Sequence, residues 1–189
     1  MDGVRLELME RQLSLVQALQ WRRSERWCLT LWGRYIKARD GHRCLICGAG
    51  ERLHAHHIFR RALYPHGWYQ PGNGITLCHE CHERPHAVFN GRPDFNQPVD
   101  AQGGDDLENV ACYFQCLLVD ANARRLGHDD FYFIEDHMLQ FIVSLQGHGH
   151  LYDAVQQGKM SRLQMAYQAM RGAPEVVYRR LFEANVPVT

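Results

Sequence analysis

The sequence predicts a fold of the α+β class, in which helical segments flank a small central segment of different character. Apolar residues recur at helical spacing before residue 40 and again after residue 104. Between Cys44 and about Phe95 this periodicity disappears, and glycine, proline, histidine and cysteine dominate. Such a segment has too little apolar material for a core of its own and generally needs a bound metal to fold.

These changes along the chain predict four regions. We expect N-terminal helices over residues 1–39, a compact metal-dependent module over 40–95, a linker over 96–104 and a C-terminal helical region over 105–189. The linker is suggested by its proline and glycine residues, which interrupt both helices and strands.

Helical periodicity places individual helices within these regions. A helix over about 5–22 is expected from its apolar residues, which are Leu6, Met9, Leu13 and Val16. A second helix is expected over about 25–38, before the turn at Asp40-Gly41. After the linker, the spacing predicts helices over about 107–121, 131–145, 161–170 and 174–184.

Composition narrows the class of protein. No apolar run reaches the ~18 to 20 residues that a membrane helix needs, and the N-terminus lacks the apolar core of a signal peptide. We therefore expect a cytoplasmic protein with no membrane partner. The net charge is zero, but residues 1–100 carry +4 and residues 101–189 carry −4. A phosphate backbone is therefore expected to meet the first half.

The seven cysteines do not suit a disulfide framework, because their number is odd. Four of them form two CxxC pairs, Cys44/Cys47 and Cys78/Cys81, separated by 30 residues. Two such pairs supply four thiolates, which close the shell of one tetrahedral zinc and leave no place for substrate. The sequence therefore predicts a structural zinc. The other three cysteines are expected to be small core residues: Cys28, Cys112 and Cys116.

Histidines cluster in and directly after the segment between the two pairs. His56 and His57 are adjacent, Asn73 lies in a glycine-rich turn, and His82 and His86 are four residues apart. On a helix that last spacing places both imidazoles on one face, where they can bind one cation.

This order of residues resembles the HNH motif, and the bracketing cysteines resemble the zinc-stapled branch of that endonuclease family. The resemblance covers about residues 40–90. It implies that this segment is a small ββα-metal nuclease module, which the N-terminal helices and a C-terminal bundle would flank. It also implies hydrolysis of DNA phosphodiester bonds to 3′-hydroxyl and 5′-phosphate ends, with RNA as a further possible substrate.

The resemblance implies a role for each residue of the motif. His57 matches the general base that takes a proton from the attacking water, and Asn73 matches the residue that ties down the loop and orients this base. His56, His82 and His86 match ligands of a catalytic cation, Mg²⁺ or another such as Mn²⁺ or Ni²⁺. A neutral imidazole, with an ordinary pKa near ~6.5, is a competent base at cellular pH.

Three points qualify these assignments. Pro85 lies between the two helical ligands and is tolerated only near the start of a helix. Asn73 has a second reading, as the turn residue that its glycine neighbours suggest. Arg60 and Arg61 follow the histidine pair, and their charges fit either contacts to DNA phosphates or a solvated surface.

Two other functions fit parts of the sequence. A non-catalytic zinc-ribbon protein that binds nucleic acid accounts for the cysteines, but leaves the histidines and Asn73 without a role. An interaction protein with a vestigial nuclease module would make the acidic C-terminal region the working part. The nuclease reading is compatible with restriction, phage DNA processing, mobile-element cleavage or a toxin, and no feature of the sequence favours one oligomeric state.

Overall fold

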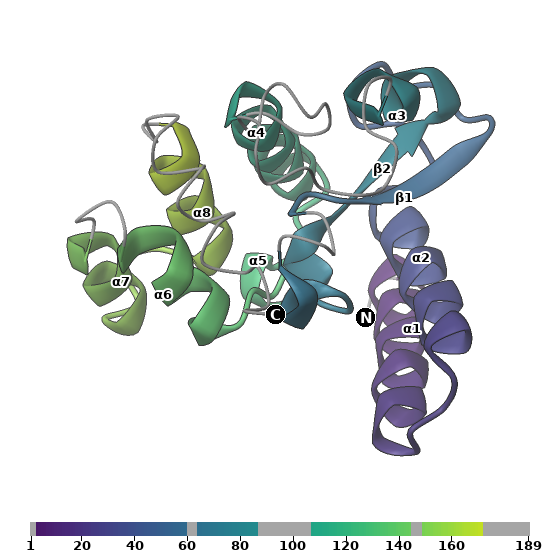
Figure 1. Ribbon diagram of the computed structural model, residues 1–189, viewed down its shortest axis with the longest axis horizontal. Coiled ribbons are helices and arrows are strands. Elements are labelled where there is room, and N and C mark those ends of the chain that lie inside the picture. The colour runs from purple at the N-terminus through teal and green to yellow at the C-terminus, as the bar shows by residue number, and fades with distance from the viewer. Residues whose placement is uncertain (1–2, 60–63, 87–106, 145–148, 172–189) are drawn as a thin grey trace, which may run out of the picture.

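The computed structural model describes residues 3–59, 64–86, 107–144 and 149–171 (Figure 1). The described part contains eight α-helices, two 3₁₀ turns and one antiparallel pair of strands, which confirms the α+β class. In chain order they are α1 (Gly3–Gln20), α2 (Glu25–Arg39), β1 (Leu53–His57), η1 (Pro65–Gly67), η2 (Pro71–Asn73), β2 (Gly74–Cys78), α3 (His79–His86), α4 (Leu107–Ala123), α5 (His128–Phe131), α6 (Asp136–Ser144), α7 (Gly149–Gln156) and α8 (Arg162–Arg171).

The two N-terminal helices form a pair at one end of the molecule (Figure 1). The helix predicted over 5–22 is present as α1, but the face that predicted it is not the buried one. Its buried residues are Leu8, Leu15 and Ala18. The residues of the predicted stripe are each more than 40% exposed: Leu6, Met9, Leu13 and Val16. Helix α1 therefore carries two apolar faces, and only one of them packs on α2.

The C-terminal region is helical, as predicted, but its segments differ in detail. The helix expected over 131–145 corresponds to α6, which begins only at Asp136, while Phe131 ends the short helix α5, which was not predicted. Helix α7 was not predicted, and α8 matches the helix expected over 161–170. The predicted linker over 96–104 and the helix over 174–184 lie outside the described residues.

The strands lie between α2 and α3, each of which contacts both of them. In the antiparallel register, Leu53 faces Cys78 and His57 faces Gly74. Gly74 is buried, and a Cβ there would lie 2.6 Å from the indole of Trp32 and 2.7 Å from Ile36. A glycine is therefore needed where α2 crosses the end of the hairpin.

A buried ion pair fixes the loop that precedes β2. Arg39 and Asp40 are fully buried and hydrogen-bonded to each other at 2.7 Å. The guanidinium also donates to the carbonyl oxygens of Pro71 and Gly74, and the Asp40 carboxylate accepts from the Thr76 amide. Since a buried charge is costly unless it is paired and hydrogen-bonded, this pair strongly constrains the loop.

The end of α5 and the residues after it contact α2 and the same loop. The Gly72 amide donates to the Phe133 carbonyl at 2.8 Å, and the Tyr35 hydroxyl donates to the Phe131 carbonyl at 2.8 Å. One hydrophobic cluster, which includes Cys44 and Cys78, extends from α1 to α8.

Cys28 is in the interior as predicted, whereas Cys112 is exposed and Cys116 only half-buried, against the prediction. None of the helices in the described ranges has the length and apolarity needed to cross a bilayer.

Candidate metal centre and active site

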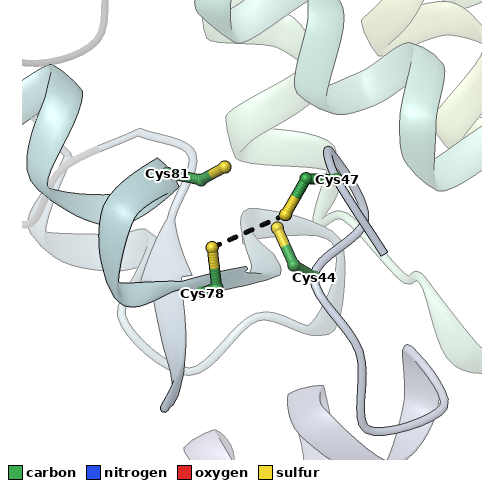
Figure 2. Close-up of side chains that lie close together, drawn as sticks. All are labelled: Cys44, Cys47, Cys78 and Cys81. Atoms are coloured by element: carbon green, nitrogen blue, oxygen red, sulfur yellow. Dashed lines mark hydrogen bonds between the residues drawn. The ribbon is translucent and has the colours of Figure 1, made fainter. Parts of the chain in front are cut away.

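The four cysteines of the two CxxC pairs converge on one point (Figure 2). Their sulfur atoms all lie within 4.8 Å of one another, and Cys47 Sγ lies 3.6 Å from Cys78 Sγ. Zn–S bonds of ~2.3 Å in a tetrahedron place the sulfurs ~3.8 Å apart. The cluster therefore fits a zinc ion with four thiolate ligands, as the sequence predicted.

Local backbone geometry brings the first pair into this position. Gly48 has a φ of +79°, which favours glycine, and its amide donates to the Cys44 carbonyl at 2.8 Å. Burial raises the pKa of Cys44, but hydrogen bonds from backbone amides, those of Cys47 and Cys78 first among them, outweigh burial and lower it to about 7. The pKa of Cys81 is raised, by burial and by hydrogen bonds to the neighbouring thiols. Four thiolates together therefore require a bound cation.

Alternation along β1 separates the two adjacent histidines. Side chains of a strand point alternately to opposite faces, so His56 shares a face with His54, and His57 shares the other with Ala55. The His56 side chain is buried towards α3, whereas His57 is half-buried towards α2. The two adjacent histidines thus lie in different environments, one beside α3 and the other beside α2.

The His57 ring is held from two sides. It stacks on Trp32 of α2, with ring centroids 4.0 Å apart and planes 9° from parallel. Its Nε2 lies 2.9 Å from the carbonyl oxygen of Trp68. A carbonyl oxygen only accepts hydrogen bonds, so in the neutral ring Nε2 carries the proton and Nδ1 the lone pair. The arrangement selects the tautomer in which Nδ1 is the basic atom.

Asn73 connects the loop to the segment directly after His57. Its side chain is fully buried, accepts a hydrogen bond from the Phe59 amide at 2.8 Å and donates to the Phe59 and Gly67 carbonyls. It is also the last residue of the 3₁₀ turn η2. Asn73 is therefore both a turn residue and a hydrogen-bonded link between the loop and Phe59. Its geometry is suited to fixing the loop that carries the Trp68 carbonyl.

A second histidine cluster lies on the other face of β1. His56 and His82 meet edge to face with centroids 5.2 Å apart, one from the strand and the other from α3. Helix α3 continues through Pro85 and ends one residue later, so the proline lies in the second turn. The His86 side chain lies outside what the structure describes. His56 and His82 are donors of the type that a divalent transition-metal ion accepts, and they come from opposing elements.

Three residues near this cluster were given no role from the sequence. His54 stacks on His82 at 4.8 Å, and His79 lies 5.7 Å from His54. Loss of hydration, followed by the charges of His79 and Lys37, lowers the pKa of His54. Tyr113 of α4 packs edge to face on His56 at 5.5 Å. The i, i+2 spacing of His54 and His56 signals their common face, but no sequence pattern signals Tyr113.

An open cleft of about 470 Å³ runs between α2 and β1. Its lining includes His57 and His82 together with Arg34 and Lys37, two basic residues of α2. The predicted phosphate contacts, Arg60 and Arg61, lie outside the described residues. Among the described residues, the positive charges that line this cleft belong to α2, to which the sequence analysis assigned no functional residue.

Comparison with known proteins supports the same conclusion for the centre of the chain. Residues 44–84 match the model of a family described as HNH endonuclease. No curated protein and no solved structure matches the chain. The matched residues begin at Cys44, the first cysteine of the cluster, and include β1, β2 and most of α3. The resemblance to HNH endonucleases inferred from the sequence is thereby confirmed for residues 44–84.

Proposed function

We propose that the protein is a metal-dependent endonuclease that hydrolyses DNA phosphodiester bonds, with His57 as general base. The observation that carries the proposal is the way His57 is held. Trp32 fixes the plane of its ring, and the Trp68 carbonyl selects the tautomer. A ring held in one orientation and one tautomer at the wall of a cleft suits a proton acceptor.

In the proposed reaction, His57 Nδ1 takes a proton from a water molecule as the water oxygen attacks phosphorus. The bond between phosphorus and the 3′ oxygen breaks, which leaves a 5′-phosphate and, after protonation, a 3′-hydroxyl. Asn73 supports this step indirectly, because it ties the loop of the Trp68 carbonyl to the residues after His57. A base positioned in this way typically contributes ~10² to 10⁴ in rate.

His56 and His82, with His86 as a further ligand, would hold the catalytic cation. When bound, Mg²⁺, Mn²⁺ or Ni²⁺ would supply positive charge to the phosphate and to the departing 3′ oxygen. Imidazole ligands leave positions of such an ion open, whereas four thiolates close the zinc site. In this proposal the cysteine site stabilises the fold, and the histidine site holds the cation that takes part in the reaction.

A plasmid assay tests the proposal against the zinc-ribbon alternative. Supercoiled DNA is incubated with the protein and Mg²⁺, Mn²⁺ or Ni²⁺, with EDTA as the control, and duplex RNA replaces DNA in a parallel series. The nuclease proposal expects cation-dependent conversion to nicked or linear DNA. Binding without cleavage under every cation would favour the zinc ribbon. A cytoplasmic location, where thiols stay reduced and available to zinc, is part of the proposal.

A further inference from the structure

Helix α2 lines the cleft together with His57, and its outer face is basic. The exposed or half-buried residues of this face lie within about 100° of one another on a helix of 3.6 residues per turn: Arg26, Thr30, Gly33, Arg34 and Lys37. The opposite face is buried: Cys28, Trp32, Tyr35, Ile36 and Arg39. One side of α2 thus builds the core, and the other side presents charge to the cleft.

We propose that this face of α2 binds the phosphodiester backbone of the DNA substrate, with Arg34 and Lys37 contacting phosphates near the one that is cleaved. The inference rests on the proposed function, since it assigns the substrate's path through that site. None of the described residues that line the cleft is acidic. An anionic polymer therefore meets only neutral or positive groups beside His57.

The two side chains are available for such contacts. Neither Arg34 nor Lys37 forms a salt bridge with the residues that the structure describes, whereas Arg43 and Arg124 share the buried carboxylate of Asp120. The Arg34 guanidinium lies over the exposed ring of Trp27, 6.0 Å from its centroid. That contact orients the cation and leaves its donors for a phosphate.

The floor of the cleft allows a backbone to approach the base. Gly33 of α2 and Ala55 of β1 lie side by side, and a Cβ on Gly33 would lie 3.6 Å from that of Ala55. These are the two smallest residues of the lining. A DNA strand lying along the cleft would therefore pass His57 and His82 as well as Arg34 and Lys37 of α2.

The test measures binding apart from cleavage. Fluorescence anisotropy of a labelled DNA duplex is recorded with EDTA present, for wild type, Arg34→Gln, Lys37→Gln and the double variant, between 50 and 200 mM salt. Each single change should weaken binding several-fold and reduce the slope of log affinity against log salt by about one, and the double change by about two. Arg171→Gln, at an exposed arginine of α8, is the matched control and should change neither value.

Each outcome separates this inference from the proposed function. If wild type cleaves DNA but the α2 variants bind with unchanged affinity and slope, the inference is wrong and the nuclease proposal stands. If wild type does not cleave under any cation, the proposed function fails first. Arg34→Lys and Lys37→Arg should restore most of the binding. If polyglutamate displaces the labelled DNA as effectively as unlabelled DNA of the same total charge does, this face would instead be assigned to acidic proteins.

Discussion

The imidazole of His57 lies parallel to the indole of Trp32, with their centroids 4.0 Å apart. Trp32 belongs to α2, outside the segment that matches the HNH family, and its side chain is 2% exposed. Its Nε1 also donates to the carbonyl oxygen of Gln70 at 3.2 Å. One side chain of the N-terminal helix pair thus contacts both the proposed base and the loop that orients it.

Substitutions of Trp32 should therefore separate the effect of its stacking on His57 from that of its hydrogen bond to Gln70. Trp32→Phe keeps a flat ring beside His57 but loses the hydrogen bond to Gln70, so we expect a modest fall in kcat. Trp32→Ala removes the stacking partner and leaves a cavity, which typically costs 3–5 kcal/mol of stability. Steady-state kinetics and thermal melts check both variants. Equal kcat for Phe and Ala variants, measured while both are folded, would show that the stacking does not position the base.

The role of His57 is tested by its removal. His57→Ala should lower the cleavage rate by ~10² to 10⁴, because the lost group accepts a proton. The zinc content should stay that of wild type and the protein should remain folded, since the side chain binds no metal in the proposed arrangement. His150→Ala, at an exposed histidine of α7, is the matched control. Wild-type cleavage by His57→Ala would assign the base to another residue.

Asn73 should matter for both stability and rate. Asn73→Ala leaves the Phe59 amide and the Phe59 and Gly67 carbonyls without their buried partner. An unsatisfied buried group typically costs ~1–3 kcal/mol, so unfolding should shift to a lower denaturant concentration. Asn73→Asp keeps the acceptor but loses both donated bonds and buries a carboxylate against two carbonyl oxygens, so it should lower stability at least as much as Asn73→Ala does. A variant with full kcat and reduced stability would restrict Asn73 to the role of a turn residue.

One zinc ion per chain is expected at the four cysteines. Elemental analysis of freshly purified protein should find it, and Cys47→Ser should reduce both the zinc content and the folded fraction. Cys112→Ser is the control, because Cys112 is exposed and is not one of the four cluster cysteines. Acid should release the metal, since protons compete with zinc for the thiolates. Less than about half an equivalent of zinc in folded protein would contradict the structural site.

The two metal sites should respond differently to mild chelation. Neutral imidazoles bind a cation more weakly than four thiolates do, so brief EDTA treatment should remove activity and spare the zinc. Added Mg²⁺ or Mn²⁺ should restore cleavage. His82→Ala should abolish cleavage and the second metal while retaining zinc, because Cys81 points to the cysteine cluster and His82 to the histidines. Activity that follows zinc content alone would remove the second site from the mechanism.

The chemistry-bearing residues were more predictable than the packing around them. Spacing alone was enough for the cysteine cluster, because two CxxC pairs can share one tetrahedral ion. The buried face of α1 does not follow from its periodicity, since Leu6 and Leu13 form as regular a stripe as Leu8 and Leu15 do. Local periodicity does not state which of two stripes meets a neighbour. Only tertiary structure decides that.

Contacts between distant parts of the chain could not be predicted from the sequence for the same reason. Trp32 and His57 are 25 positions apart, and Tyr113 follows His56 by 57 positions. Each pair depends on how α2 and α4 pack against the hairpin. Helix α7 was missed because its eight residues begin with glycine and histidine, which are weak helix formers. The histidine pair itself was predictable, since alternation along a strand requires only local geometry.

The pairing of Leu53 with Cys78 has one more consequence. A shift of β1 by a single residue would turn every side chain of the strand to the opposite face, so His56 and His57 would exchange places. The proposed ligand would then face Trp32, and the proposed base would face His82. Because Cys78 is both a strand residue and a member of the cysteine cluster, a metal bound at that cluster would also fix the strand register that gives each histidine its face.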